Sequence, residues 1–220
     1  PGWFLWDTKE MKNILIWLKD FNNNLDNEKK VTFYGIDIVA PNNGLDQIFE
    51  YLQKVDESFL EKIRNKNYAK NIINDNNWPK SLQGYAELTS EKKQILHLNY
   101  NELYQHIKHN AATYTTASSE IEYSWILRLA YSANEANKMF SAEKRMEIGL
   151  IRDNAMAQNA LWIKKRLSAE DKMIIWAHNV HIAKGEFTMT GEAGSIKGMG
   201  YILNQELKNM IDDLKILLHQ

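Results

Sequence analysis

The stretch Ile174-Ile175-Trp176-Ala177-His178-Asn179-Val180-His181 is an apolar run that ends abruptly in two histidines. Its first residues have the character of a buried strand, whereas its end offers side chains that can titrate. In α/β folds, ligands and catalytic groups lie where strands end at the mouth of a sheet. The end of this run is therefore the first candidate site.

A second apolar run, Val31-Thr32-Phe33-Tyr34-Gly35-Ile36-Asp37-Ile38, also predicts a buried strand. It follows a segment that begins at Asp7-Thr8-Lys9-Glu10 with the spacing of a capping box and continues with helical apolar spacing to Phe21. Helical spacing returns over 45–67 and over three long segments at about 90–110, 117–139 and 141–167. The pattern predicts an α/β fold with a helical layer or insertion.

Length and composition describe an ordinary globular chain. Its 220 residues, 44% apolar and 25% charged, suffice for one large domain or a domain with an insertion. With a net charge of −1, nothing indicates nucleic acid or an anionic membrane as a partner. The start at Pro1-Gly2 lacks an initiator methionine and a signal peptide, so we expect a fragment of a longer protein, with the cytoplasm as the default compartment.

The chain has no cysteine, which removes disulfides, thiol nucleophiles and thiolate metal sites. His178 and His181 can supply an acid, a base or a metal ligand. They would point to opposite sides of an extended chain, and a turn or helix start at Asn179 would bring them to one side. The other histidines, for which we expect solvent exposure and no role, are His97, His106, His109 and His219.

A second candidate group lies on a predicted helix. Arg152, Asn159 and Trp162 share one broad face, where they could anchor a carboxylate or an oxyanion. The structural alternative is Arg152 paired with Asp153 or with a neighbouring helix, and Asn159 satisfying backbone groups. Asp37, at the end of the first strand, could orient a histidine or cap the next helix.

Four ordered motifs resemble the erythromycin esterase family. They are Phe33-Tyr34-Gly35-Ile36-Asp37, the helix from Arg152-Asp153 to Trp162, the run from Trp176 to Gly185, and Met199-Gly200. The resemblance implies an α/β fold with a mixed β-sheet core flanked by helices and a long helical insertion. Residues 1–85 would begin the core, 86–140 would form the insertion, and 141–220 would complete the core. The family includes macrolide esterases and proteins labelled succinoglycan-biosynthesis-like.

The resemblance also implies hydrolysis of a small-molecule carboxylic ester, such as a macrolactone, by water activated without a bound metal or other cofactor. His178 or His181 would hold the substrate carbonyl or shuttle a proton, and Arg152 would offset oxyanion charge. The residues expected to bind or orient the substrate are Asp37, Asp153, Asn159 and Asn179. The resemblance gives no oligomeric state.

Departures from the family pattern leave alternatives open. The family's general base is a histidine in a Gly-Glu-x-x-His-Gly type segment, which we expect upstream of Pro1, so we expect these residues alone to be inactive. One alternative is a haem- or iron-binding protein with His178 or His181 as ligand. The other is a non-catalytic accessory of exopolysaccharide assembly, in which sugar-stacking side chains would be Trp3, Trp6, Trp17 and Trp78.

Overall fold

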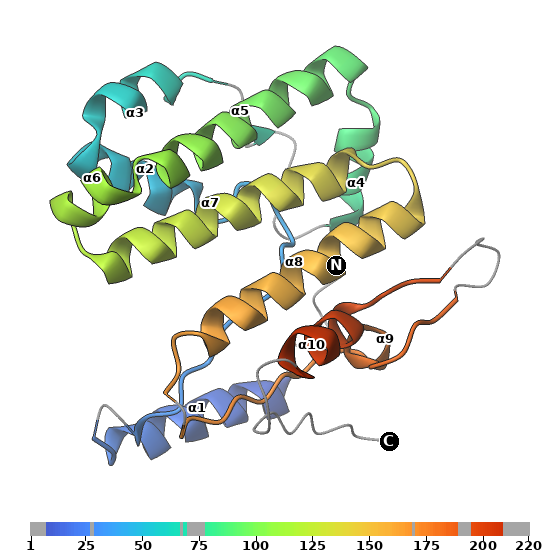
Figure 1. The fold of residues 1–220 in the computed structure, drawn as a ribbon. Coiled ribbons are helices and arrows are strands. Elements are labelled where there is room, and N and C mark those ends of the chain that lie inside the picture. Colours follow the sequence, from blue (N-terminus) through green and yellow to red (C-terminus); the bar gives the residue numbers. More distant parts are fainter. Residues whose placement is uncertain are drawn as a thin grey trace.

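The computed structural model describes residues 8–26, 29–66, 68–69, 78–168, 170–188 and 195–208. These residues form an α-helical structure (Figure 1). The helices are α1 (Lys9–Asn23), α2 (Leu45–Val55), α3 (Glu57–Ile63), α4 (Trp78–Ala86), α5 (Ser90–His109), α6 (Ala111–Ala117), α7 (Glu120–Ser141), α8 (Arg145–Lys164), α9 (Asn179–Ile182) and α10 (Met199–Lys208). None of the described helices is both long and apolar enough to cross a membrane.

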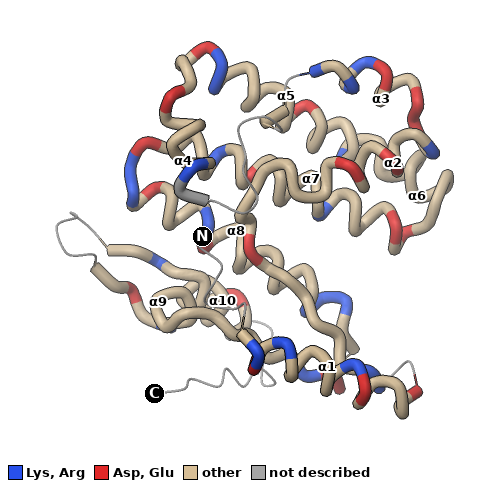
Figure 2. The backbone as a smooth tube through the Cα atoms, turned by 180° about the vertical axis from the view of Figure 1, so that it is seen from behind, with Lys and Arg blue, Asp and Glu red and all other residues tan. Residues whose placement is uncertain are grey.

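The larger hydrophobic core lies among α2, α3, α5, α6 and α7. On α5, the buried residues Leu96, Tyr100, Leu103 and Ile107 follow helical spacing and face the layer that contains α7. Burial of each such side chain contributes about 1.5–3 kcal/mol. Basic and acidic residues are interspersed along the helices (Figure 2). This is typical of helices that have one face in water.

A smaller cluster lies where α8, α9 and α10 meet. Its buried members are Met156, Ala157, Ala160, Leu161, Ile182, Met199 and Leu203. Helix α8 packs against α7 of the larger core and against α10 of this cluster, so it connects the two (Figure 1). Its middle turn therefore holds side chains at the junction of the two apolar regions.

The predicted mixed β-sheet core is wrong. The described residues contain no strand, and their only β-type pairing is an isolated antiparallel bridge between Phe187 and Ile196. The two apolar runs at 31–38 and 172–176 instead join helices without regular secondary structure. An apolar run indicates only that some of its side chains are buried. A strand also needs a neighbouring strand for its backbone hydrogen bonds, and sequence spacing does not reveal one.

The predicted helical segments are confirmed, with shifts at their ends. The segment expected over 45–67 consists of α2 and α3, separated at Asp56, whose side chain accepts a hydrogen bond from the Phe59 amide at 3.0 Å and so caps α3. At the first helix, Thr8 takes the capping position, and its hydroxyl accepts from the Met11 amide at 3.2 Å. The asparagine-rich stretch at 71–79 predicts a loop, but residues 71–77 lie outside the described residues and α4 already begins at Trp78. A helix is also predicted over 206–220, and of this range the structure describes residues 206–208, at the end of α10.

Candidate active site

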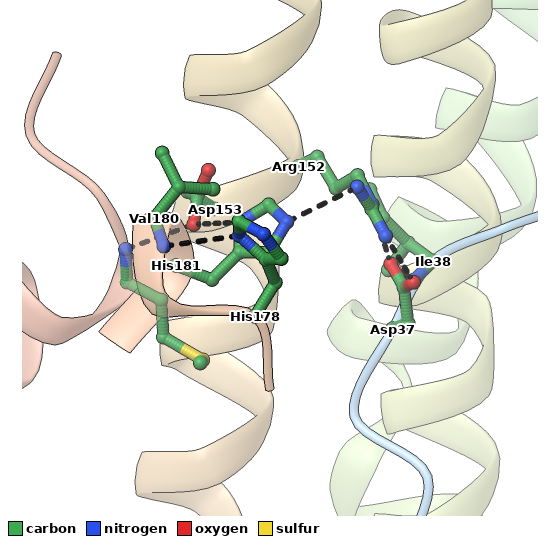
Figure 3. Close-up of polar contacts among 8 residues, drawn as sticks. Asp37, Ile38, Arg152, Asp153, His178, Val180 and His181 are labelled. Carbon is green, nitrogen blue, oxygen red and sulfur yellow. Dashed lines mark hydrogen bonds and ion pairs between the residues drawn. The ribbon is translucent and has the colours of Figure 1, made fainter. Parts of the chain in front are cut away.

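Arg152 and Asp37 form a two-point ion pair at the centre of the site. Nε of Arg152 donates to Oδ1 of Asp37 at 2.9 Å, and Nη2 donates to Oδ2 at 2.6 Å (Figure 3). Oδ1 of Asp37 also accepts from the Ile38 amide at 2.8 Å. Burial on its own lowers the pKa of Arg152, but the hydrogen bonds and charge of Asp37 outweigh it and raise that pKa. Arg152 therefore stays a fixed cation.

His181 and Asp153 form a second pair on the other side of Arg152. Nδ1 of His181 lies 2.8 Å from Oδ1 of Asp153, whose side chain is only 4% exposed. The same oxygen accepts a hydrogen bond from the backbone amide of Met199 at 3.0 Å. Because this oxygen serves as an acceptor, the network places the imidazole proton on Nδ1 of His181.

The two pairs meet between Arg152 and His181. Nη1 of Arg152 lies 3.4 Å from Nε2 of His181 (Figure 3). A guanidinium can only donate, so Nε2 of His181 faces it as the acceptor. The separation is at the long end of the hydrogen-bond range. The charged donor Nη1 of Arg152 and the proton acceptor Nε2 of His181 are thus neighbours in the site.

Asn159 anchors the segment that carries Asp37. Its amide nitrogen donates to the carbonyl of Ile36 at 2.8 Å, and its oxygen accepts from Nε of Arg128 at 2.6 Å and from Ser132 at 3.3 Å. Burial lowers the pKa of Arg128, whose Cζ lies 4.2 Å from the centre of the Tyr131 ring. Asn159 therefore satisfies a backbone group, as the structural alternative expected, and also fixes the residue that precedes Asp37.

The structure brings together five of the predicted site residues: Asp37, Arg152, Asp153 and His181 directly, and Asn159 as a support. His178 does not join them. It is exposed and caps α9, with Nδ1 accepting from the Val180 amide at 3.3 Å. Asn179 is the exposed first residue of α9, so the helix start that the sequence allowed is present, yet it turns only one of the two histidines into the site.

Two elements of the site were not predicted from sequence. Arg128 is one arginine on a long amphipathic helix, 31 residues from Asn159, and nothing in its spacing marks it. The Met199 amide is a backbone group, although Met199-Gly200 was noted as a motif. His106, expected to be exposed and without a role, is half-buried and lies 2.9 Å from Oδ2 of Asp56.

The candidate site contains two carboxylates and one half-buried imidazole, each already engaged with a partner. Among the described residues, no group of three or more histidine, aspartate and glutamate side chains is arranged to hold a metal ion. The arrangement offers general acid–base chemistry at Nε2 of His181 and stabilisation of negative charge by Arg152. A reaction that creates an oxyanion would use both.

Comparison with known proteins matches this chain to a protein family. The model of that family, described as erythromycin esterase, matches residues 2–211. A curated relative, erythromycin esterase type II of Escherichia coli, is 26% identical over 219 aligned residues, covering 93% of this chain and 50% of the relative. This chain therefore spans about half the length of that relative.

Solved structures give the same result for the fold. A Bacillus cereus protein superposes with a TM-score of 0.72 at 26% identity, covering 90% of this chain and 46% of its own. A succinoglycan biosynthesis protein superposes at 0.66 with 24% identity over 94% and 47%. An erythromycin esterase EreC mutant in its open conformation superposes at 0.70 with 16% identity over 87% and 48%. With the family model covering nearly the whole sequence, this chain belongs to the erythromycin esterase family.

Proposed function

We propose that these residues supply part of the active site of a carboxylic ester hydrolase. The observation that supports this proposal is the continuous contact from Asp37 through Arg152 and His181 to Asp153. Family membership supports the reaction class. The chain spans about half the length of its relative, so we assign the activity to the longer protein. The substrate is a small ester, and the shape of the pocket would decide which ester binds.

In the proposed mechanism, His181 is the proton carrier that this chain contributes. Asp153 accepts the proton on Nδ1, which fixes the ring and leaves the Nε2 lone pair available. The base that the resemblance places upstream of Pro1 takes a proton from the attacking water, whose oxygen bonds to the ester carbonyl carbon, and passes that proton to Nε2 of His181. The same proton then passes to the departing alcohol oxygen as the carbon–oxygen bond breaks. The carboxylic acid and alcohol products together contain the ester and one water.

Arg152 stabilises the charge that develops in this step. Its guanidinium is held by two hydrogen bonds to Asp37 and directs Nη1 toward the same place as Nε2 of His181. A carbonyl oxygen that becomes negative there would receive a preorganised charged donor. Loss of one such donor in an enzyme lowers the rate by about 10²–10³-fold. Asp37 thus acts as a positioning residue for Arg152.

The surroundings of His181 favour ester chemistry over iron ligation. Nδ1 is engaged by Asp153, and Nε2 faces a guanidinium at 3.4 Å. A metal cation at Nε2 would stand next to this fixed positive charge, which opposes its binding. His178, the other candidate ligand, is exposed and its Nδ1 caps α9.

The experiment is incubation of the complete gene product with erythromycin and a panel of simple esters, followed by mass spectrometry. Gain of one water by a substrate identifies the esterase. His181→Ala is expected to lower that turnover by about 10²–10⁴-fold, the usual contribution of a positioned acid–base group. His109→Ala, at an exposed position in α5, serves as the matched control. Equal turnover in the two variants, or turnover of no ester by the wild type, would contradict the proposal.

A further inference from the structure

Large apolar side chains are exposed at one end of the molecule. The exposed fractions there are 74% for Ile174, 68% for Phe33, 65% for Trp176 and 60% for Trp17. They belong to α1 and to the two segments that were expected to be strands, at 31–38 and 172–176. Figure 1 shows α1 at the end of the molecule away from α3 and α5. We call these four side chains the apolar face.

Helix α1 has no buried residue along its fifteen positions. Its exposed apolar side chains are Ile14, Leu15, Ile16, Trp17 and Phe21. Among the described residues, the ring of Trp17 stacks on the ring of Phe21 at 5.3 Å. An isolated helix of this length is marginal in water, and most helix stability in proteins comes from packing of an apolar side. Helix α1 therefore has the properties of an element that packs against something else.

Covered and open side chains alternate in the second segment, whereas in the first segment the open residues 31–35 come before the covered Ile36. Ile36, Met173 and Ile175 pack against the smaller cluster around α8 and α10, whereas Phe33, Ile174 and Trp176 point to solvent. Asn22 of α1 joins the first segment to the helix, because its side chain exchanges two hydrogen bonds with the backbone of Val31, at 2.8 and 2.9 Å. The exposed side chains thus belong to connected segments, which the smaller cluster and the hydrogen bonds of Asn22 hold in place.

We propose that the apolar face is the surface on which the other half of the longer polypeptide packs. The chain corresponds to 46–50% of the length of its relatives, so a comparable length of chain exists in them beyond the part that matches. Several large apolar side chains left exposed on connected segments mark a surface against which other polypeptide packs. A covalently attached segment would also reach the face at a high effective concentration, an advantage that a second copy lacks.

The position of the face connects it to the candidate active site. The first segment continues from Phe33 to Asp37, and the second continues from Trp176 to His181. Polypeptide that covers the face therefore borders the space between Arg152 and His181. In this arrangement the site lies at the junction of two halves of the protein.

The test is carbene footprinting of the complete gene product, read by mass spectrometry. Ile174 and Ile121 form a matched pair, since they are the same residue type with exposures of 74% and 67%, and Ile121 lies in the first turn of α7, outside the face. We expect Ile174 to be labelled about tenfold less than Ile121, because a covered side chain loses most of its contact with water. Equal labelling of the two would overturn the proposal.

Dilution distinguishes the two possible occupants. Protection of Ile174 that persists when the protein is diluted to a monomer supports the attached half, whereas protection that disappears assigns the face to a second copy and overturns the proposal. A gene product with no residues beyond these 220 would also overturn it.

A pair of lysine substitutions gives an independent measurement on the complete protein. Ile174→Lys is expected to lower Tm by about 5 °C or more, because it places a charge in a covered apolar contact. Ile121→Lys is expected to change Tm by less than about 2 °C. Equal Tm values for the two variants would contradict the proposal.

Discussion

Gly200 lies directly against the main-chain carbonyl of Ile182. A Cβ on Gly200 would stand 2.2 Å from that oxygen, and one on Gly198 would stand 3.0 Å from the carbonyl oxygen of Val180. The start of α10 therefore touches the backbone on both sides of His181. The amide of Met199, between the two glycines, donates to Asp153. One short segment thus positions both the histidine and its carboxylate partner.

Replacement of Gly200 by alanine is expected to separate α9 from α10 and to displace His181. A shift of about 1 Å at a catalytic group can lower turnover by about 10²-fold, and overpacking costs about 1–3 kcal/mol of unfolding free energy. Gly149→Ala is the control. Gly149 lies within α8 with no atom near its absent Cβ, so alanine there should stabilise the protein by up to about 1 kcal/mol. Urea unfolding and ester turnover measure both effects, and identical behaviour of the variants would refute this role.

Asp153→Asn is expected to disturb the protonation of His181 more than the fold. The variant keeps the shape of the side chain but removes the charge and offers an amide that can donate where the carboxylate only accepts. We expect long-range ¹H–¹⁵N spectra of the wild type to place the His181 proton on Nδ1, and turnover of the variant to fall by about 10²–10⁴-fold. The exposed Asp171→Asn is the control. A wild-type ring protonated on Nε2 alone would show that the assigned network is wrong.

The helical part of the fold was predictable because helical spacing repeats over many turns. The apolar positions of α5 and α7 recur often enough to identify each helix from sequence. Helix α9, with four residues, is too short for such a pattern. The run at 172–176 misled because its alternate residues Met173 and Ile175 are partly buried against the smaller cluster without a strand partner. In the run at 31–38 only the end is covered, from Ile36 onward, and residues 31–35 are exposed.

The sequence predicted most of the residues of the site, but not which of them contact each other. Asp37 and Arg152 were both named, yet they are 115 residues apart, and sequence spacing cannot show that the arginine binds this carboxylate. The adjacent Asp153 was one structural alternative as partner of Arg152, but on a helix two successive side chains point in different directions, and Asp153 faces His181 instead. Long-range pairing depends on how α8 lies between the two clusters, which is a property of the fold.

Asn159→Ala is expected to destabilise the protein through Arg128. The substitution removes the acceptor of the 2.6 Å hydrogen bond from Arg128 and the donor to the carbonyl of Ile36. A half-buried cation and a carbonyl would lose their partners, at a cost of about 2–4 kcal/mol. Ser132→Ala, which removes only the 3.3 Å contact to the same oxygen, should cost less than about 1 kcal/mol. Equal losses in urea unfolding would show that Arg128 does not depend on Asn159.

The last prediction concerns Asp56, in the helical layer outside the site. Its carboxylate accepts from the hydroxyl of Tyr114 at 2.7 Å and from the Phe59 amide at 3.0 Å, and it lies 2.9 Å from Nε2 of His106. Burial alone would raise the pKa of Asp56, but these hydrogen bonds, with one from Ser58, outweigh it and lower that pKa from 3.8 to about 2.

Because the folded pKa of Asp56 is depressed, its charged form stabilises the protein above about pH 4, and that stability is lost as the pH falls toward 2. The shift corresponds to roughly 2 kcal/mol at neutral pH. Asp56→Asn keeps an effective cap for α3 but removes the charge. In urea unfolding, the variant should be about 2 kcal/mol less stable than the wild type at pH 7, with the difference shrinking as the pH falls below 4. The exposed Asp20→Asn should show no such convergence, and a difference independent of pH would mean that Asp56 stabilises the layer without its charge.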